Sequence, residues 1–177
     1  KISYFIKEVF VPITLGGGIR SLKDISKALT SGADKISINS YATENPDFIK
    51  KAVKEFGSST ITIYIEAKKI GEKKWEIYKY YGREKTGIDL KQWINKIQDY
   101  DCGEILLTSI DYEGLQKGFD IELLDEVCNL IDKPLIFSGG CGSAKDVNFI
   151  KKNYPNISLS IASAFHYNKI VPYKIKS

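Results

Sequence analysis

The 177-residue sequence predicts an α/β fold built around a parallel β-sheet. Short apolar runs alternate with amphipathic stretches along the chain, which is the pattern of successive βα units. A glycine-rich βα segment also occurs twice, as expected of a fold that repeats one supersecondary unit. Hydrophobic residues make up 43% and charged residues 27% of the sequence. This balance is typical of a globular chain, and no linker divides it, so residues 1–177 are expected to form one domain.

Six apolar runs predict the strands. Because Ile, Leu and Val dominate these runs, we expect strands that are apolar on both faces, as in a sheet covered on both sides. The predicted strands are Val11–Leu15, Lys35–Asn39, Thr60–Glu66, Glu104–Ser109, Pro134–Phe137 and Ser158–Ala162.

Five segments with apolar residues at three- and four-residue spacing predict helices between these strands. The predicted helices are Ser21–Ser31, Pro46–Phe56, Leu90–Tyr100, Ile121–Ile131 and Ala144–Asn153. Gly32 and Gly57 follow two of them and are placed as helix stops. Residues 2–8 resemble the end of a further helix.

One stretch departs from this alternation. Between Lys68 and Gly82, aromatic and apolar residues alternate too quickly for a helix, and Gly71 offers a turn. The pattern predicts a β-hairpin inserted near residues 68–82, after the third predicted strand.

Composition excludes several classes of function. The formal charge of +4 is spread along the chain, so a nucleic-acid-binding tail is not expected. No apolar run approaches the ~20 residues of a membrane helix. Cys102, Cys128 and Cys141 fit neither a disulfide framework nor a zinc knuckle, which favours a reducing cytoplasm. With His166 as the single histidine, zinc and hydrolase sites are set aside, and no metal or cofactor is expected.

The internal repeat is the strongest signal in the sequence. Pro12–Asp24 aligns with Pro134–Asp146 without gaps, matching the proline, two glycines, a serine, a lysine and an aspartate. After one inserted residue, residues 36–40 match residues 159–163. Two copies of one βαβ unit, about half a (β/α)8 barrel apart, would lie on opposite sides of the face where that fold places its sites.

Each copy offers a glycine turn that suits a phosphate. Paired glycines let the backbone approach an anion, and a following helix adds its positive end. The alternative is that the glycines serve only to make tight βα turns. The duplication favours two phosphate sites and hence a bisphosphate ligand. The expected binding residues are Gly17, Gly18, Asn39 and Ser40 for the first site and Gly139, Gly140, Ala162 and Ser163 for the second.

Several motifs resemble the cyclase subunit of imidazole glycerol phosphate synthase. They are Gly16-Gly-Gly-Ile-Arg20, Gly32-Ala-Asp-Lys-Ile-Ser-Ile-Asn39, Gly103-Glu-Ile-Leu-Leu-Thr-Ser-Ile-Asp111, Ser138-Gly-Gly140 and Ala162-Ser-Ala-Phe-His166. The resemblance implies a (β/α)8 TIM barrel that takes ammonia from a glutaminase partner. It also implies conversion of a phosphoribulosyl formimino carboxamide nucleotide into imidazole glycerol phosphate, with release of an aminoimidazole ribotide.

Two departures from the family pattern stand out. Barrels of this type run to ~250 residues, so the chain is expected to hold about six of eight βα units and to be a fragment, since it begins at Lys1 and lacks methionine. The family's first catalytic aspartate would then fall outside the chain. Its second corresponds to Glu66, in Ile65-Glu-Ala-Lys68. Glu66 is the expected acid/base, and a surface carboxylate paired with Lys68 or Lys69 is the alternative.

Further roles are carried over by resemblance. Gly114 joins the phosphate ligands, while Thr108, Asp111 and Ser138 orient the substrate; for Asp111 and its neighbour Glu113, turn chemistry is an equal alternative. Lys35 and Glu104 match two members of the charged gate that admits ammonia, with N-terminal-face ion pairing as the alternative. Asp34 would face the glutaminase, and His166 would pack near the last phosphate site.

Three other functions stay open. A related glutaminase-coupled barrel delivers ammonia to a sugar for amidino-glycan synthesis, and the change from Asp to Glu suits an altered acceptor. The isomerase that acts one step earlier shares the phosphate repeats but has no gate. A non-catalytic fragment could dock a glutaminase and only bind phosphate. Six strands also cannot close an eight-stranded barrel, so self-association through the open side is expected.

Overall fold

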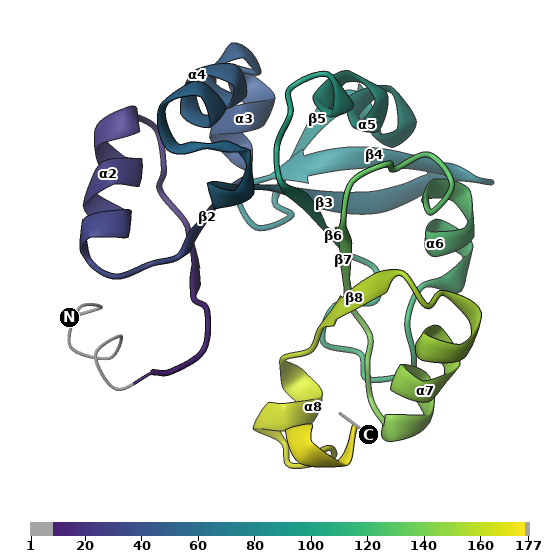
Figure 1. Cartoon of the computed structure of the whole chain (residues 1–177). Helices are drawn as coiled ribbons and strands as arrows, with labels where there is room; N and C mark the ends of the chain where they lie inside the picture. The colour runs from purple at the N-terminus through teal and green to yellow at the C-terminus, as the bar shows by residue number, and fades with distance from the viewer. Residues whose placement is uncertain (1–8, 176–177) are drawn as a thin grey trace.

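A computed structural model describes residues 9–175 and shows a parallel sheet that curls like an open half-barrel, with helices along its outer side (Figure 1). The six strands of the curl pair in chain order, and every pair among them is parallel. They are β1 (Thr14–Gly16), β2 (Lys35–Ile38), β3 (Ile61–Gly71), β6 (Glu104–Ser109), β7 (Leu135–Ser138) and β8 (Ile157–Ser160). The predicted partial (β/α)8 barrel is therefore confirmed.

The five predicted helices are all present. They are α2 (Leu22–Thr30), α4 (Asp47–Phe56), α5 (Leu90–Gln98), α6 (Ile121–Val127) and α7 (Ala144–Asn153). Two short helices, α3 (Ser40–Glu44) and α8 (Ser163–His166), and 3₁₀ turns at Ser58–Thr60 and Pro172–Lys174 were not predicted. The helix expected at residues 2–8 lies outside the described residues.

The two faces of the strands differ, which corrects the expectation that both would be apolar. Side chains alternate along a strand, and one set of alternate residues is aliphatic or aromatic and buried. This set includes Ile36, Ile63, Ile65, Ile105, Leu107 and Phe137. The other set, on the concave face, is rich in Thr, Ser, Tyr and Glu; members on β3 are Thr62, Tyr64 and Glu66. Aliphatic residues thus form the helix-covered core, and the polar face is left for a ligand.

The serine and aspartate of the internal repeat are helix caps. In the first copy the Ser21 hydroxyl accepts from the Asp24 N–H at 3.2 Å and donates to the Asp24 carboxylate at 2.8 Å. In the second copy Ser143 and Asp146 form a complete capping box at the start of α7. The two copies also share strand register. Thr14 and Ile136 are equivalent positions of the repeat, as are Lys35 and Ser158, and Thr14 pairs with Lys35 while Ile136 pairs with Ser158. The repeat is therefore one βαβ unit built twice.

The predicted hairpin is larger than residues 68–82. Strand β3 does not end at Glu66 but continues to Gly71, where it pairs antiparallel with β4 (Lys74–Lys79). A further strand, β5 (Glu84–Asp89), pairs antiparallel with β4. The insertion is thus a three-stranded meander whose first strand is a barrel strand. The turn between β4 and β5, residues 80–83, lies near the carboxyl ends of the barrel strands, and we call it the hairpin tip.

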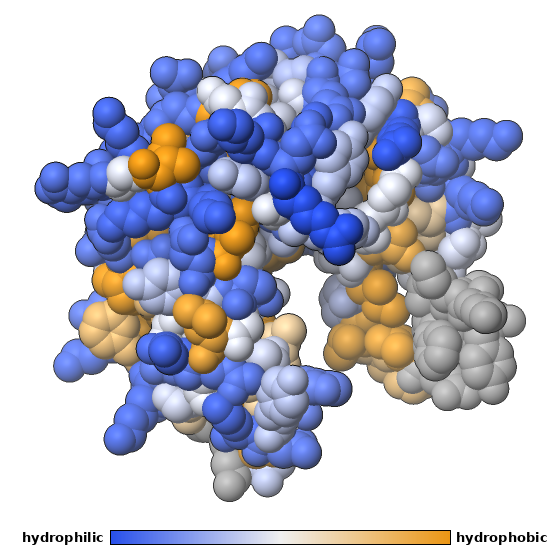
Figure 2. All heavy atoms as spheres, turned by 180° about the vertical axis from the view of Figure 1, so that it is seen from behind, coloured by the Kyte–Doolittle hydropathy of each residue, from blue (hydrophilic) through white to orange (hydrophobic). Residues whose placement is uncertain are grey.

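The curl is open on one side. Within residues 9–175, β1 and β8 each pair with one neighbour, and they do not pair with each other. Figure 2 shows the opening from behind as a hollow between two lobes, with apolar side chains beside it. Val9, Phe10 and Val11, which lead into β1, are exposed, Phe10 almost completely. An apolar edge is therefore available for pairing.

The start of β6 supplies a test of this packing. A Cβ on Gly103 would lie 2.5 Å from the backbone oxygen of Ser58, whereas a Cβ on Gly71 would meet no atom closer than 3.9 Å. Gly103→Ala is expected to destabilise the fold by about 1–3 kcal/mol, as overpacking does. Gly71→Ala is the matched control and should change little. Thermal unfolding of both variants measures the difference; equal melting temperatures would contradict this packing.

Candidate active site

A cleft of about 750 Å³ occupies the concave face of the sheet. The strand register arranges its lining in rows across the sheet. Glu66, Thr108, Ser138 and Ser160 are successive partners toward the carboxyl ends of the strands. Ser37, Thr62 and Glu104 are partners in a row toward the amino ends. The cleft therefore runs from one end of the half-barrel to the other.

Glu66 is buried at the carboxyl-end row, with 7% of its surface exposed. The Asn39 side-chain amide donates to its Oε2 atom at 3.1 Å, and the Tyr64 hydroxyl lies 3.5 Å from Oε1. Burial raises the pKa of the Glu66 carboxyl, and the bond from Asn39 and the approach of the Gly82 backbone N–H partly oppose that rise. No ion pair joins Glu66 to Lys68 or Lys69 among the described residues, which disfavours the surface-carboxylate alternative.

Tyr64 lies on the same face of β3 as Glu66, two residues nearer the amino end of the strand, and was missed by the sequence analysis. Burial raises the pKa of its hydroxyl to about 12, so the group keeps its proton at neutral pH. It can donate a hydrogen bond but cannot act as a base there. Only its position two residues before Glu66, on the same face of a strand, could have indicated this location.

The first glycine turn lines the same cleft. Gly17 and Gly18 have φ angles of 100° and 70°, which a side chain rarely adopts, and a Cβ on Gly18 would meet no atom within 4 Å. Asn39 and Ser40 line the cleft beside them. The four residues expected at the first phosphate site are thus together, with open space around the turn.

The second glycine turn is packed more tightly. A Cβ on Gly139 would lie 2.8 Å from the Ser109 backbone oxygen, and one on Gly140 would lie 2.0 Å from the Gly118 backbone oxygen. Close approach of the neighbouring loops therefore requires glycine at both positions. The turn also borders a small hollow that Ala162 and Ser163, two residues expected at the second site, line together with Ser138 and Glu113. An acidic side chain therefore borders the space beside the second turn.

At the amino end of the sheet, Lys35 and Glu104 form an ion pair. The Lys35 ammonium lies 2.5 Å from one oxygen of Glu104, and the Thr62 hydroxyl donates to the other at 2.7 Å. Glu104 and Thr62 line the lower end of the cleft. Asp34 accepts from the Ile13 N–H at 2.7 Å and so holds the loop before β1.

Other predicted residues divide between the cleft and the surface. Thr108 and Ser138 line the cleft. Asp111 and Gly114 are exposed and line neither hollow; the Asp111 carboxylate accepts from the Lys69 N–H of β3 at 2.8 Å, which ties the loop after β6 to that strand. His166 is exposed on α8, with its ring edge-on to Tyr167. The sequence analysis missed Arg20, Glu44, Tyr80 and Tyr81, which also line the cleft.

Three observations bear on the excluded classes. No described helix is long and apolar enough to cross a membrane. Within residues 9–175, no three His, Cys, Asp or Glu side chains gather as metal ligands would. The three cysteines are free thiols, and burial raises the pKa of Cys102 and of Cys141 to about 11.

Fold and cleft together define a (β/α)-barrel protein with a buried carboxyl beside a glycine turn at the carboxyl ends of its strands, where such barrels act on small ligands. The family model described as "Histidine biosynthesis protein" matches residues 1–171. The chain belongs to this family.

The curated relatives agree with this assignment. The chain is 42% identical over 171 residues to the imidazole glycerol phosphate synthase subunit HisF of Lactococcus lactis subsp. cremoris (strain MG1363), covering 96% of the chain and 66% of that protein. It is 46% identical over 169 residues to the protein of the same name from Dictyoglomus thermophilum (strain ATCC 35947 / DSM 3960 / H-6-12), covering 96% and 67%. For Prochlorococcus marinus (strain AS9601) the identity is 43% over 180 residues, covering 99% and 70%. The chain spans about two thirds of the length of these relatives.

The buried carboxyl predicts a pH-dependent stability. A carboxyl whose pKa is raised by folding does not affect stability below its unfolded pKa, and it lowers stability as the pH rises through the unfolded and then the folded value. Glu66→Gln should therefore raise the melting temperature at pH 8 by a few degrees, at about 2–4 °C per kcal/mol for a domain of this size. The gain should vanish below about pH 4, the unfolded pKa of glutamate.

The matched control is Glu55→Gln, at an exposed position in α4. Calorimetry of both variants at the two pH values decides the matter. A Glu66→Gln gain that persists unchanged in acid would show that charge burial is not its cause.

Proposed function

We propose that this chain carries the ammonia-dependent cyclase chemistry of imidazole glycerol phosphate synthase, with Glu66 as an acid/base. The substrate is a phosphoribulosyl formimino carboxamide nucleotide, and the products are imidazole glycerol phosphate and an aminoimidazole ribotide. The observation that carries the proposal is the position of Glu66: a buried carboxyl, hydrogen-bonded to Asn39, in a cleft that Gly17 and Gly18 also line. The family resemblance supplies the reaction, and the relatives are named as subunits of imidazole glycerol phosphate synthase.

The environment of Glu66 suits proton transfer. Addition of ammonia and closure of a ring both require a proton to leave one nitrogen and reach another atom. A carboxyl whose pKa is raised by burial holds a proton more readily than an exposed carboxyl does and can pass it on to the substrate. The neighbouring Tyr64 hydroxyl, which stays protonated, can donate to the carboxylate or to the substrate.

The two glycine turns would anchor the two ends of the substrate. The first turn offers open backbone with Asn39 and Ser40 beside it. The second offers the hollow beside Ala162 and Ser163. Backbone N–H groups at such turns attract phosphate without a charged side chain. A bisphosphate bound at both turns would extend across the carboxyl-end row that contains Glu66.

The opposite end of the cleft supports a second part of the proposal, the entry of ammonia from a glutaminase partner. Lys35, Glu104 and Thr62 form one hydrogen-bonded group where the cleft reaches the amino ends of the strands. A small neutral molecule that passes this group would follow the polar concave face toward Glu66. The relatives are named as subunits, which fits a partnership of two chains. Asp34, at the same end, would face the partner.

One observation favours a second acceptor. The resemblance calls for aspartate where this chain has Glu66, and the longer side chain moves the carboxyl by about an ångström, a displacement that can cost ~100-fold in rate. A glutaminase-coupled barrel that aminates a sugar for amidino-glycan synthesis would accommodate this change through a different acceptor. A fragment that only binds phosphate is distinguished by its lack of turnover.

Turnover with ammonia tests the proposed function. We expect the nucleotide substrate to bind to this chain and to a version extended by the βα units that the relatives carry beyond the matched region. The extended version should turn over, and Glu66→Ala should lower its kcat by ~10²–10⁴-fold, as loss of an acid/base does. Calorimetric titration and a product assay supply the two measurements.

Glu66→Asp distinguishes the two acceptors. Higher turnover in Glu66→Asp supports the histidine-pathway substrate and shows that glutamate at this position weakens catalysis. Loss of turnover shows that glutamate is the adapted residue and favours the other acceptor. If Glu66→Ala leaves the extended version unaffected, Glu66 is not catalytic.

The open edge of the sheet leads us to propose self-association of the 177-residue chain studied alone. The one-sided pairing of β1 and the exposed Val9–Val11 segment leave an apolar edge that a second copy can cover. Sedimentation velocity should show dimers or larger species whose share grows with concentration. A monodisperse, thermally robust monomer at every concentration would refute the proposal.

A further inference from the structure

The hairpin tip has an unusual backbone beside the catalytic carboxyl. Tyr80, Tyr81 and Gly82 follow one another with φ angles of 53°, 63° and 71°. Side-chain-bearing residues rarely adopt this left-handed region, so two tyrosines in succession need strong contacts to stay there. Residues held in such conformations concentrate at functional sites. The tip is part of the site, because Tyr80 and Tyr81 line the cleft.

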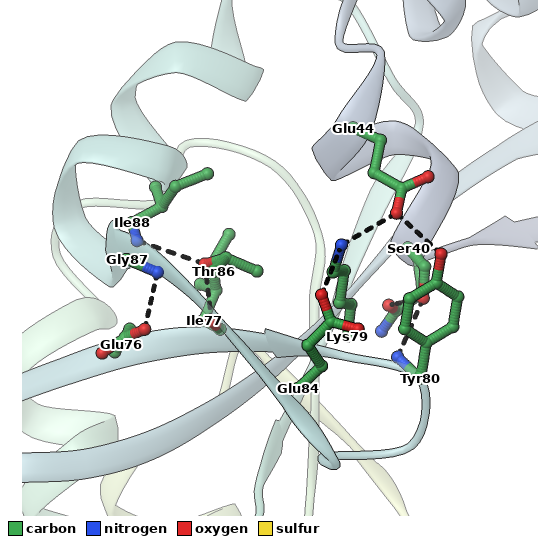
Figure 3. Close-up of polar contacts among 11 residues, drawn as sticks. Ser40, Glu44, Glu76, Ile77, Lys79, Tyr80, Glu84, Thr86, Gly87 and Ile88 are labelled. Carbon is green, nitrogen blue, oxygen red and sulfur yellow. Dashed lines mark hydrogen bonds and ion pairs between the residues drawn. The ribbon is translucent and has the colours of Figure 1, made fainter.

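Figure 3 shows the contacts that hold the tip to α3. The Tyr80 hydroxyl donates to Glu44 at 2.7 Å, and the Lys79 ammonium bridges Glu44 at 3.0 Å and Glu84 at 2.9 Å. Lys79 is largely shielded, with 18% of its side chain exposed. The bond from Tyr80 lowers the pKa of the Glu44 carboxyl, so Glu44 stays ionised as an acceptor. We call the Tyr80–Glu44–Lys79 group the clasp.

A chain of hydrogen bonds connects the clasp to the catalytic carboxyl. The Tyr80 N–H donates to the Ser40 hydroxyl at 3.0 Å. The Ser40 hydroxyl donates to the Asn39 side-chain oxygen at 3.1 Å, and the Asn39 amide nitrogen donates to Glu66 at 3.1 Å. The donors run in one direction, so each group orients the next. Ser40 and Asn39 line the cleft with the first glycine turn, so this series of hydrogen bonds passes beside the proposed first phosphate site.

We propose that Tyr80 and Glu44 are positioning residues for the reaction: the clasp holds the left-handed tip in place, and the tip orients Glu66 through Ser40 and Asn39. The proposal rests on the catalytic role of Glu66 in the proposed function. It goes beyond that function by assigning a task to α3 and to the meander, whose strands lie outside the repeated βαβ units.

The rest of the hairpin does not depend on the clasp. Glu76 accepts from the Gly87 N–H at 2.6 Å, and the Thr86 hydroxyl donates to the Ile77 oxygen at 2.7 Å (Figure 3). These bonds join β4 to β5 away from the cleft. Loss of the Tyr80 hydroxyl should therefore loosen the tip while the hairpin stays formed. Glu76→Gln perturbs the hairpin away from the tip and is the matched control.

Steady-state kinetics in the form that turns over supply the first test. We expect Tyr80→Phe and Glu44→Ala to lower kcat about tenfold, since small displacements of a catalytic group are costly, and to leave KM for the nucleotide within about twofold. Glu44→Gln keeps an oxygen that accepts from Tyr80 and should recover most of the kcat lost in Glu44→Ala. Glu76→Gln should match the parent protein. Equal kcat values for Tyr80→Phe and Glu76→Gln would overturn the proposal.

Nuclear magnetic resonance supplies a second test that needs no turnover. The side-chain amide signals of Asn39 report its bonds to Ser40 and Glu66. They should shift in Tyr80→Phe and in Glu44→Ala and stay in place in Glu76→Gln. If they do not respond to either clasp variant, the chain of bonds does not transmit position and the proposal fails. If they respond while the parent protein shows no turnover, the positioning holds and the proposed reaction fails instead.

Discussion

The pairing of β3 with β6 is the constraint on which the rest of the molecule depends. Six parallel residue pairs lock these two strands together, from Thr62 with Glu104 to Ala67 with Ser109. Because side chains alternate, this register sends Thr62, Tyr64 and Glu66 to one face and Ile63 and Ile65 to the other. A shift by one residue would bury the carboxyl under the helices and turn isoleucine into the cleft. The core and the lining of the cleft are therefore specified by one set of backbone hydrogen bonds.

The concave face combines two opposite requirements. A ligand needs polar groups within the half-barrel, while a buried ionisable group lowers stability unless it is hydrogen-bonded. The molecule separates these charges along the cleft: Glu104 is neutralised by Lys35 at the amino end, and Glu66 is held by an uncharged amide at the carboxyl end. No cationic side chain among residues 9–175 pairs with Glu66, and burial raises its pKa. What costs stability is thus what suits the carboxyl to proton transfer.

Sequence patterns predicted most of the architecture and only part of the site. Apolar runs and helical spacing located the six barrel strands and five helices, and the two copies of the repeat have the same strand register and the same type of helix cap. Asn39 and the first glycine turn directly follow β2 and β1, and Glu66 stands in a motif that resembles the family pattern, so the sequence could point to all of them. The third strand of the meander, residues 84–89, carries Gly87 and four charged or hydroxyl side chains and has a weak strand signal. Glu44, Tyr80 and Tyr81 reach the cleft only through contacts between residues some 36 to 40 positions apart, which no local pattern encodes.

The continuity of β3 restricts how this protein can vary in evolution. Connections between strands and helices usually tolerate insertions and deletions. The chain from Glu66 to the tyrosines of the tip, however, runs along the end of β3 and back along β4, and these two strands form a paired ribbon. An odd number of added or removed residues there would exchange the two faces of the ribbon and turn Tyr80 away from Ser40. Only even changes matched on both strands of the ribbon would keep the facing of the side chains. The meander is therefore expected to conserve its length more strictly than the exposed loops of the same barrel.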